Sequence, residues 1–105
     1  MVIIETPIFT KLITDLMSDD EYKDLQEALV NRPDRGAIIK NSGGLRKVRW
    51  ALEGRGKSGG VRIIYYWMTE DDQLYMMFAF PKNAQENLTD AQTKQLRQMV
   101  ERWSQ

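Results

Sequence analysis

The chain has 105 residues, of which 42% are hydrophobic and 29% charged, and its formal net charge is zero, as is ordinary for one globular domain with a modest core. It contains no cysteine and no histidine, which excludes disulfides, thiolate metal sites, a cysteine nucleophile and the usual acid–base group of neutral pH. We find neither a signal-peptide pattern at the N-terminus nor an apolar run near the roughly 20 residues of a membrane span, so we expect a cytoplasmic protein that does not contact a membrane.

The first third of the chain predicts one strand followed by two helices. Residues 2–5 are mostly β-branched, as in a strand. The Thr6-Pro7 pair supplies a capping hydroxyl and a proline suited to the first helical position. Ser18 and Glu21 form a capping-box pattern that opens a second helix. The acids at residues 19–21 lie in its first turn, where the helix dipole favours them, so we interpret them as capping residues and not as metal ligands.

The middle of the chain predicts a β-hairpin. Residues 45–52 and 61–68 have the composition of strands, and residues 54–60 form a glycine-rich, basic loop between them. The apolar run at residues 74–80 predicts a further strand, covered on both faces. A second capping-box pattern begins at Thr89 and opens the last helix.

These elements predict an α+β fold. An N-terminal strand and two helices precede an antiparallel meander sheet of three to four strands, and a C-terminal helix follows. Residues 34–44 read as a loop that contains a short strand at residues 37–39.

The charge is unevenly distributed along the chain. Residues 1–45 carry five basic and eight acidic side chains, and residues 63–105 carry four and six. Residues 46–62 carry six basic side chains and a single acid, Glu53. Overall charge therefore gives no argument for nucleic-acid binding, but a local argument remains. We predict that the hairpin is a surface that contacts phosphates.

Strand alternation assigns the side chains of the hairpin to two faces. Lys47 and Arg49 lie on one face of the first strand, opposite the apolar Val48 and Trp50. Arg62 of the returning strand lies on the face opposite its apolar neighbours. If the register places these three cations on one face, they can together stabilise a phosphate under attack.

The strings GGLRKVRWALEGRGKSGGVRIIYYW and FAFPKN, with the order of the elements, resemble the RelE/ParE superfamily of bacterial toxins and, within it, the HigB-type members. The resemblance covers essentially all of residues 1–105 as a single toxin domain. It implies an endoribonuclease that enters the ribosomal A site, cleaves mRNA there and so inhibits translation. It also implies a cognate antitoxin that binds and silences the toxin.

The resemblance implies roles for individual residues. Catalytic roles fall on the positions of the basic strand, the return strand and the end of the apolar strand, which are Lys47, Arg49, Arg62 and Lys82. We expect contacts with RNA or the ribosome from Arg46, Arg55, Lys57, Tyr65 and Asn83. Asn83 stands where some relatives have an arginine, and Leu88 where some have a catalytic tyrosine. These departures leave the general acid unassigned.

The chemistry itself requires no metal or other cofactor. The 2′-hydroxyl of RNA can attack the adjacent phosphate when one group takes its proton, another protonates the leaving oxygen, and cations stabilise the charge that develops. Without histidine or cysteine, and without an acidic cluster in the hairpin, we expect no metal site there.

Plainer interpretations exist for the same residues. Arg46, Lys47 and Arg49 would also suit the solvated face of a strand, and the basic residues of the loop would also suit solubility. The three aromatic residues at 65–67 would offer a stacking surface to a base, but alternation turns neighbours to opposite faces, so we expect most of them in the core.

Two other functions fit the same fold. One is a ParE-like gyrase inhibitor without nuclease chemistry, and the other is a non-catalytic RNA-binding module. The cations at the positions of the cleaving relatives favour the nuclease.

Overall fold

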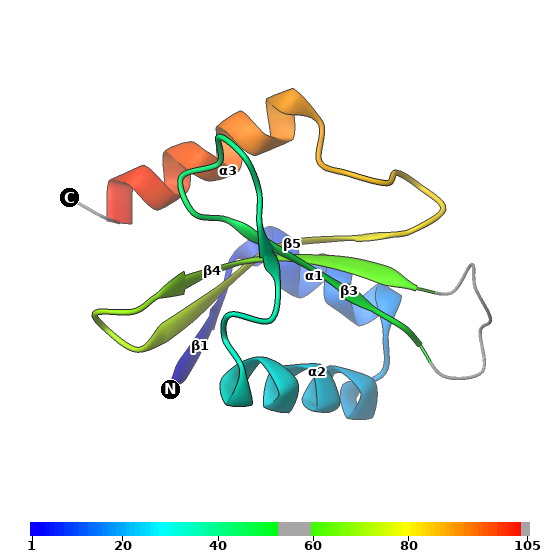
Figure 1. Ribbon diagram of the computed structural model, residues 1–105. Helices are drawn as coiled ribbons and strands as arrows, with labels where there is room; N and C mark the ends of the chain where they lie inside the picture. The colour runs from blue at the N-terminus through cyan, green and yellow to red at the C-terminus, as the bar shows by residue number, and fades with distance from the viewer. Residues whose placement is uncertain (53–59, 104–105) are drawn as a thin grey trace.

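A computed structural model describes residues 1–52 and 60–103 of the chain (Figure 1). The described residues form five strands and three helices. In chain order these are β1 (Val2–Glu5), α1 (Pro7–Leu16), α2 (Asp19–Asn31), β2 (Ala37–Ile38), β3 (Arg46–Trp50), β4 (Val61–Met68), β5 (Gln73–Pro81) and α3 (Asp90–Trp103). The predicted α+β fold and its order of elements are therefore confirmed. None of the helices in this part of the chain is both long and apolar enough to cross a membrane.

The strands form one sheet in the order β1-β5-β4-β3-β2. The last four strands in the chain, β2 to β5, pair antiparallel with their neighbours, which confirms the predicted meander. β1 adds a fifth strand, parallel to β5, with Ile3 opposite Leu74. The sequence indicated this strand but not its partner, because the pairing joins segments about 70 residues apart.

The helices begin where the local signals predict. The Thr6 hydroxyl accepts a hydrogen bond from the Phe9 N–H at 3.1 Å and donates one to the Met77 carbonyl at 2.9 Å, which ties the start of α1 to the sheet. The Ser18 and Glu21 side chains cap α2 reciprocally, which supports the interpretation of its first-turn acids as capping residues.

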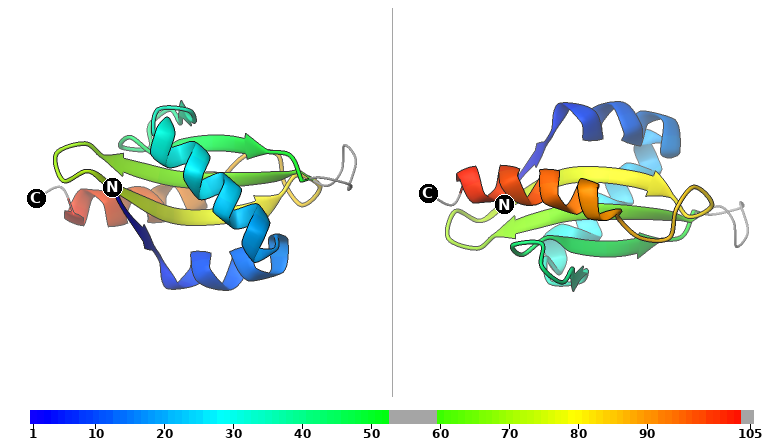
Figure 2. Two further views of the ribbon diagram at one scale, coloured as in Figure 1. Left: turned by 90° about the horizontal axis from the view of Figure 1, so that it is seen from below. Right: turned by 90° about the horizontal axis from the view of Figure 1, so that it is seen from above.

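Helices cover both faces of the sheet. The two views in Figure 2 show α2 across one face and α3 across the other, with α1 along the edge at which β1 and β5 lie. The buried core on the α1/α2 side consists of Phe9, Ile13, Met17, Leu25, Leu29, Val48, Leu52, Val61, Ile63, Tyr65, Leu74, Met76 and Ala79. The core on the α3 side consists of Leu45, Ile64, Met77, Phe80, Leu96 and Val100. β5 contributes to both, as its unbroken apolar run predicted.

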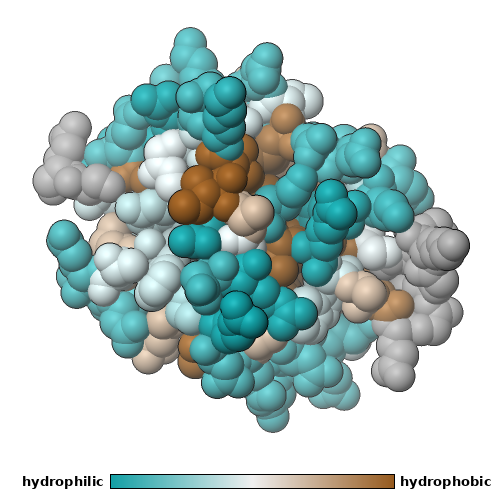
Figure 3. All heavy atoms as spheres, in the orientation of Figure 1, coloured by the Kyte–Doolittle hydropathy of each residue, from teal (hydrophilic) through white to brown (hydrophobic). Residues whose placement is uncertain are grey.

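A β-bulge adapts the sheet to this second layer. Ile64 lies opposite Phe78 and Tyr65 lies opposite Met76, so Met77 is an extra residue between the two pairs. Met77 and Phe78 consequently both contribute to the α3 side. The outer surface in the orientation of Figure 1 is mostly hydrophilic, with limited apolar areas (Figure 3).

Candidate functional site

The register of the central hairpin brings three cations onto one face of the sheet. Arg49 of β3 lies directly opposite Arg62 of β4, and Lys47 lies one cross-strand pair further along, opposite Ile64. Alternation places all three on the face covered by α3, so the register meets the condition that the sequence left open. We call Lys47, Arg49 and Arg62 the basic cluster. Like charges at directly opposed positions destabilise a sheet, so their placement calls for an explanation beyond stability.

Arg62 is the most deeply placed member of the basic cluster. Only 5% of its surface is exposed, and its Nε atom is buried without a hydrogen-bond partner. Among the described residues, the ion pairs involve other groups, and no acid pairs with Arg62. Its neighbour on β5 is the apolar Phe80. A buried guanidinium with no acidic partner in residues 1–52 and 60–103 is costly to the folded state, and an anion that reached it would offset that cost.

Lys47 is half-buried and electrostatically strained. Burial is the main cause that lowers the pKa of its ammonium group below the ordinary 10.5, and repulsion by Arg49 and Arg62 lowers it further. The Glu86 carboxylate opposes these effects in part. The Lys47 ammonium donates a hydrogen bond to the Asn87 side-chain oxygen. A lysine with a lowered pKa releases its proton more readily, so Lys47 is the member of the cluster best suited to proton transfer.

Lys82 and Asn83 follow the end of β5 at the same end of the sheet. The Lys82 N–H donates to the Gly60 carbonyl at 3.0 Å, which places Lys82 beside the residue that precedes β4. Asn83 lies in the turn that the Ala84 N–H closes onto the Pro81 carbonyl at 3.1 Å. Both side chains are exposed. They therefore lie near the basic cluster without being part of its buried group.

The sequence did not predict two residues that lie near Lys47. Glu86 and Asn87 belong to the polar segment between β5 and α3, which carries no periodic pattern. Asn87 reaches Lys47 across 40 residues of chain. The polar composition of this segment was the only signal, and it does not specify a partner.

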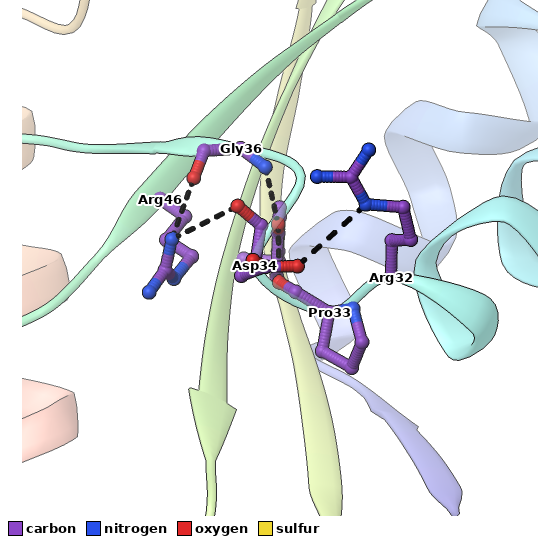
Figure 4. A network of polar contacts seen from close by, with 6 residues as sticks. Arg32, Pro33, Asp34, Gly36 and Arg46 are labelled. Atoms are coloured by element: carbon purple, nitrogen blue, oxygen red, sulfur yellow. Dashed lines mark hydrogen bonds and ion pairs between the residues drawn. The ribbon is translucent and has the colours of Figure 1, made fainter.

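Arg46 lies on the opposite face, where it holds a loop (Figure 4). Its guanidinium donates hydrogen bonds to the carbonyls of Gly36 at 2.8 Å and Asp34 at 3.2 Å. It also lies over the ring of Trp67, at 5.9 Å from the centroid. These contacts commit its charge to the loop that connects α2 to β2, away from the basic cluster.

Tyr65 also lies apart from the basic cluster. It is fully buried on the α1/α2 side, where its hydroxyl donates to the Pro33 carbonyl at 2.7 Å and accepts from the Gly36 N–H at 2.8 Å. A Cβ atom at Gly36 would come within 2.8 Å of the Tyr65 ring. The structure therefore gives Tyr65 a packing role, and it offers no stacking surface to a base.

Two predicted contacts, Arg55 and Lys57, lie outside the described residues. Within residues 1–52 and 60–103, no three histidine, cysteine or acidic side chains come together as a metal site would require.

Comparison with known proteins gives two findings. A model of the family described as "RelE toxin of RelE / RelB toxin-antitoxin system" matches residues 1–105. Among solved structures, the chain is similar to the free state of a variant of the E. coli toxin RelE in which two arginines are replaced by alanine. The two are 16% identical, the match covers 81% of this chain and 86% of that one, and the TM-score is 0.56. At this identity the likeness concerns the fold.

Proposed function

Because the chain belongs to the RelE toxin family, we propose that it is a ribosome-dependent mRNA endonuclease of the HigB type, formed by residues 1–105 as one toxin domain. It acts in the cytoplasm, in the ribosomal A site, and a cognate antitoxin neutralises it. The observation that carries the proposal is the basic cluster, in which the buried Arg62 lies opposite Arg49 and beside a lysine of lowered pKa.

Metal-independent RNA cleavage requires a group that takes a proton, a group that protonates the leaving oxygen, and cations that stabilise the developing charge. The basic cluster can supply the first and the third. In its neutral amine form, Lys47 takes the proton of the 2′-hydroxyl while the hydroxyl oxygen attacks the adjacent phosphorus, and the bond from phosphorus to the 5′-oxygen of the next nucleotide breaks. Arg62 and Arg49 stabilise the charge on the phosphate oxygens during this step. Arginine suits this role because its planar fork binds two oxygens at once. The products are a 2′,3′-cyclic phosphate and a 5′-hydroxyl, whose proton comes from a group we leave unassigned.

Residues around the cluster hold the substrate. Lys82 adds an exposed cation at the end of β5, and Asn83 lies next to it, so both suit contacts with the RNA backbone. We retain Arg55 and Lys57 as further phosphate contacts on their sequence alone. Arg46 and Tyr65 do not belong to this surface, because both are bonded to the loop on the other face.

Single-turnover cleavage on programmed ribosomes tests the proposal. We expect the wild-type protein to cut mRNA, with positions mapped by primer extension, and Arg62→Ala to be slower by about a hundredfold, the cost of one preorganised charge-stabilising donor. Inhibition of DNA supercoiling without RNA cleavage would show a gyrase inhibitor instead. Affinity for RNA without cut products would show a non-catalytic binding module.

A further inference from the structure

The segment between β5 and α3, residues 82–89, forms hydrogen bonds within itself and one hydrogen bond to the basic cluster. It runs from the end of β5 to the start of α3 (Figure 1). Near its end, the Asn87 side-chain oxygen accepts a hydrogen bond from the Lys47 ammonium. Lysine has a long side chain that loses about 2 kcal/mol of rotamer entropy when it is held in one position. A partner that already holds the ammonium in the free protein therefore reduces the entropy that Lys47 loses when the substrate binds.

Hydrogen bonds connect Asn87 to the start of α3 through Gln85. The Gln85 side-chain NH2 donates to the Asn87 backbone carbonyl and to the Gln92 side-chain oxygen, both at 2.8 Å. The same Gln92 oxygen accepts from the Thr89 N–H at 3.0 Å, and the Gln92 N–H donates to the Thr89 hydroxyl at 3.1 Å. The capping box of α3, which the sequence predicted, thus continues through Gln85 to Asn87 and Lys47.

The orientation of every amide in this chain of contacts is determined by chemistry. An ammonium group and a backbone N–H only donate, so the atoms that face them on Asn87 and Gln92 must be oxygens. The Gln92 oxygen then requires the nitrogen of Gln85, and the Asn87 carbonyl requires the same nitrogen. No amide can be rotated by half a turn without opposing two acceptors or two donors.

We propose that Asn87 is a positioning residue for Lys47, held in place by Gln85 and Gln92, and that it fixes the lysine where it can take the proton of the attacking 2′-hydroxyl. The proposal rests on the proposed function of the basic cluster. Asn87 does not react with the RNA itself. It acts through Lys47, whose other charged neighbours are Arg49 on β3, Arg62 on β4 and Glu86 in the same segment.

The contact can be measured without any RNA. The titration of Lys47, followed by NMR of its side-chain Cε and Nζ atoms and assigned with Lys47→Arg, reports the pKa directly. Asn87→Asp keeps an oxygen acceptor and adds a negative charge at hydrogen-bond distance, so we expect the pKa of Lys47 to rise by about one unit or more. Gln98→Glu, which adds the same charge on an exposed position of α3, is the matched control and should move it much less.

Single-turnover kinetics then test positioning. In metal sites, mutating a residue that orients a metal ligand lowers metal affinity or activity by about tenfold to a hundredfold. By analogy, we expect Asn87→Ala to lower the cleavage rate by about tenfold. The ribosome concentration at half-maximal rate and the melting temperature should change little. Asn87→Asp should cleave RNA with its pH profile moved upward by the same shift that NMR measures. Gln98→Ala should match the wild type.

Two results would overturn the inference. One is a Lys47 titration that Asn87→Asp moves no more than Gln98→Glu does, and the other is wild-type cleavage by Asn87→Ala. A wild-type protein that cleaves no mRNA would instead overturn the proposed function, while the Lys47 titration would still decide whether Asn87 holds the lysine.

Discussion

Replacing Arg62 by methionine should make the protein more stable and much less active. Methionine is unbranched, flexible and apolar, so it can fill the space of the arginine stem among the apolar residues of the α3 side. Arg62 is 5% exposed, and among the described residues no acid compensates its charge. Replacing a buried ion pair by well-packed apolar side chains is often neutral or stabilises a protein by about 1–4 kcal/mol, and a buried charge without an acidic partner should gain in the same way.

Arg62→Met should raise the melting temperature and lower the cleavage rate. We take about 2 kcal/mol for Arg62→Met, because one charge is removed and its buried Nε has no bond to lose. At about 4 °C per kcal/mol for a domain of this size, the melting temperature should rise by about 8 °C. The cleavage rate should fall by about a hundredfold, because a preorganised donor to the phosphate is lost. Arg62→Lys should recover only part of the rate, since it keeps the charge but not the fork.

The assay pairs thermal unfolding with single-turnover cleavage for each variant. Arg97→Met is the control, because Arg97 is an exposed arginine of α3 that pairs with Glu101 at 2.7 Å, and its loss should change stability by about 0.5 kcal/mol or less. If Arg62→Met melted below the wild type and cleaved at the wild-type rate, Arg62 would be a structural residue and the assignment would fail.

Further expected outcomes concern other parts of the molecule. The cleavage rate should rise with pH up to the lowered pKa of Lys47, and Lys47→Arg should abolish that rise. Because the pKa of Lys47 is lower in the folded state than in the unfolded state, the free energy of unfolding should also increase with pH between the lowered value and 10.5. A cleavage rate that does not change with pH would contradict the role of the lysine. Tyr65→Phe leaves the Pro33 carbonyl and the Gly36 N–H without their partner, so chemical denaturation should show a loss of about 2 kcal/mol with unchanged cleavage per folded molecule. On a minimal RNA, cleavage should not follow the identity of the divalent metal; products with a free 3′-hydroxyl would argue against the mechanism. Expression alone should arrest growth, and co-expression of the neighbouring open reading frame should restore it; free growth at high expression would count against the toxin.

Features that depend on neighbouring residues were predictable from the sequence. The caps at Thr6, Ser18 and Thr89 form because a hydroxyl meets an N–H three residues later, and that spacing is visible in the chain. The shared face of Lys47 and Arg49 follows from the two-residue period of a strand.

Features that depend on distant segments were not predictable in the same way. Alternation placed Arg62 on the correct face, but its depth of burial depends on the tertiary packing over that face, which no local pattern specifies. The contact from Asn87 to Lys47 and the pairing of β1 with β5 join segments 40 and about 70 residues apart, and no local period encodes them. The capture of Arg46 by the loop at residues 34–36 is of the same kind.

The place of β1 at the edge of the sheet has a consequence for the synthesis of the toxin. β1 is the first strand to be translated, yet its hydrogen-bonded neighbour is β5, so the sheet cannot be completed until residues 73–76 have been made. The side chain of Lys47 likewise gains its hydrogen-bond partner only when Asn87 has been made, which is later still. Long-range pairing of this kind slows folding, because the loop must close before its contacts form. We therefore expect a chain that stops before residue 73 to lack both the pairing of β1 with β5 and the contact between Lys47 and Asn87, so that the proposed active surface forms only late in synthesis.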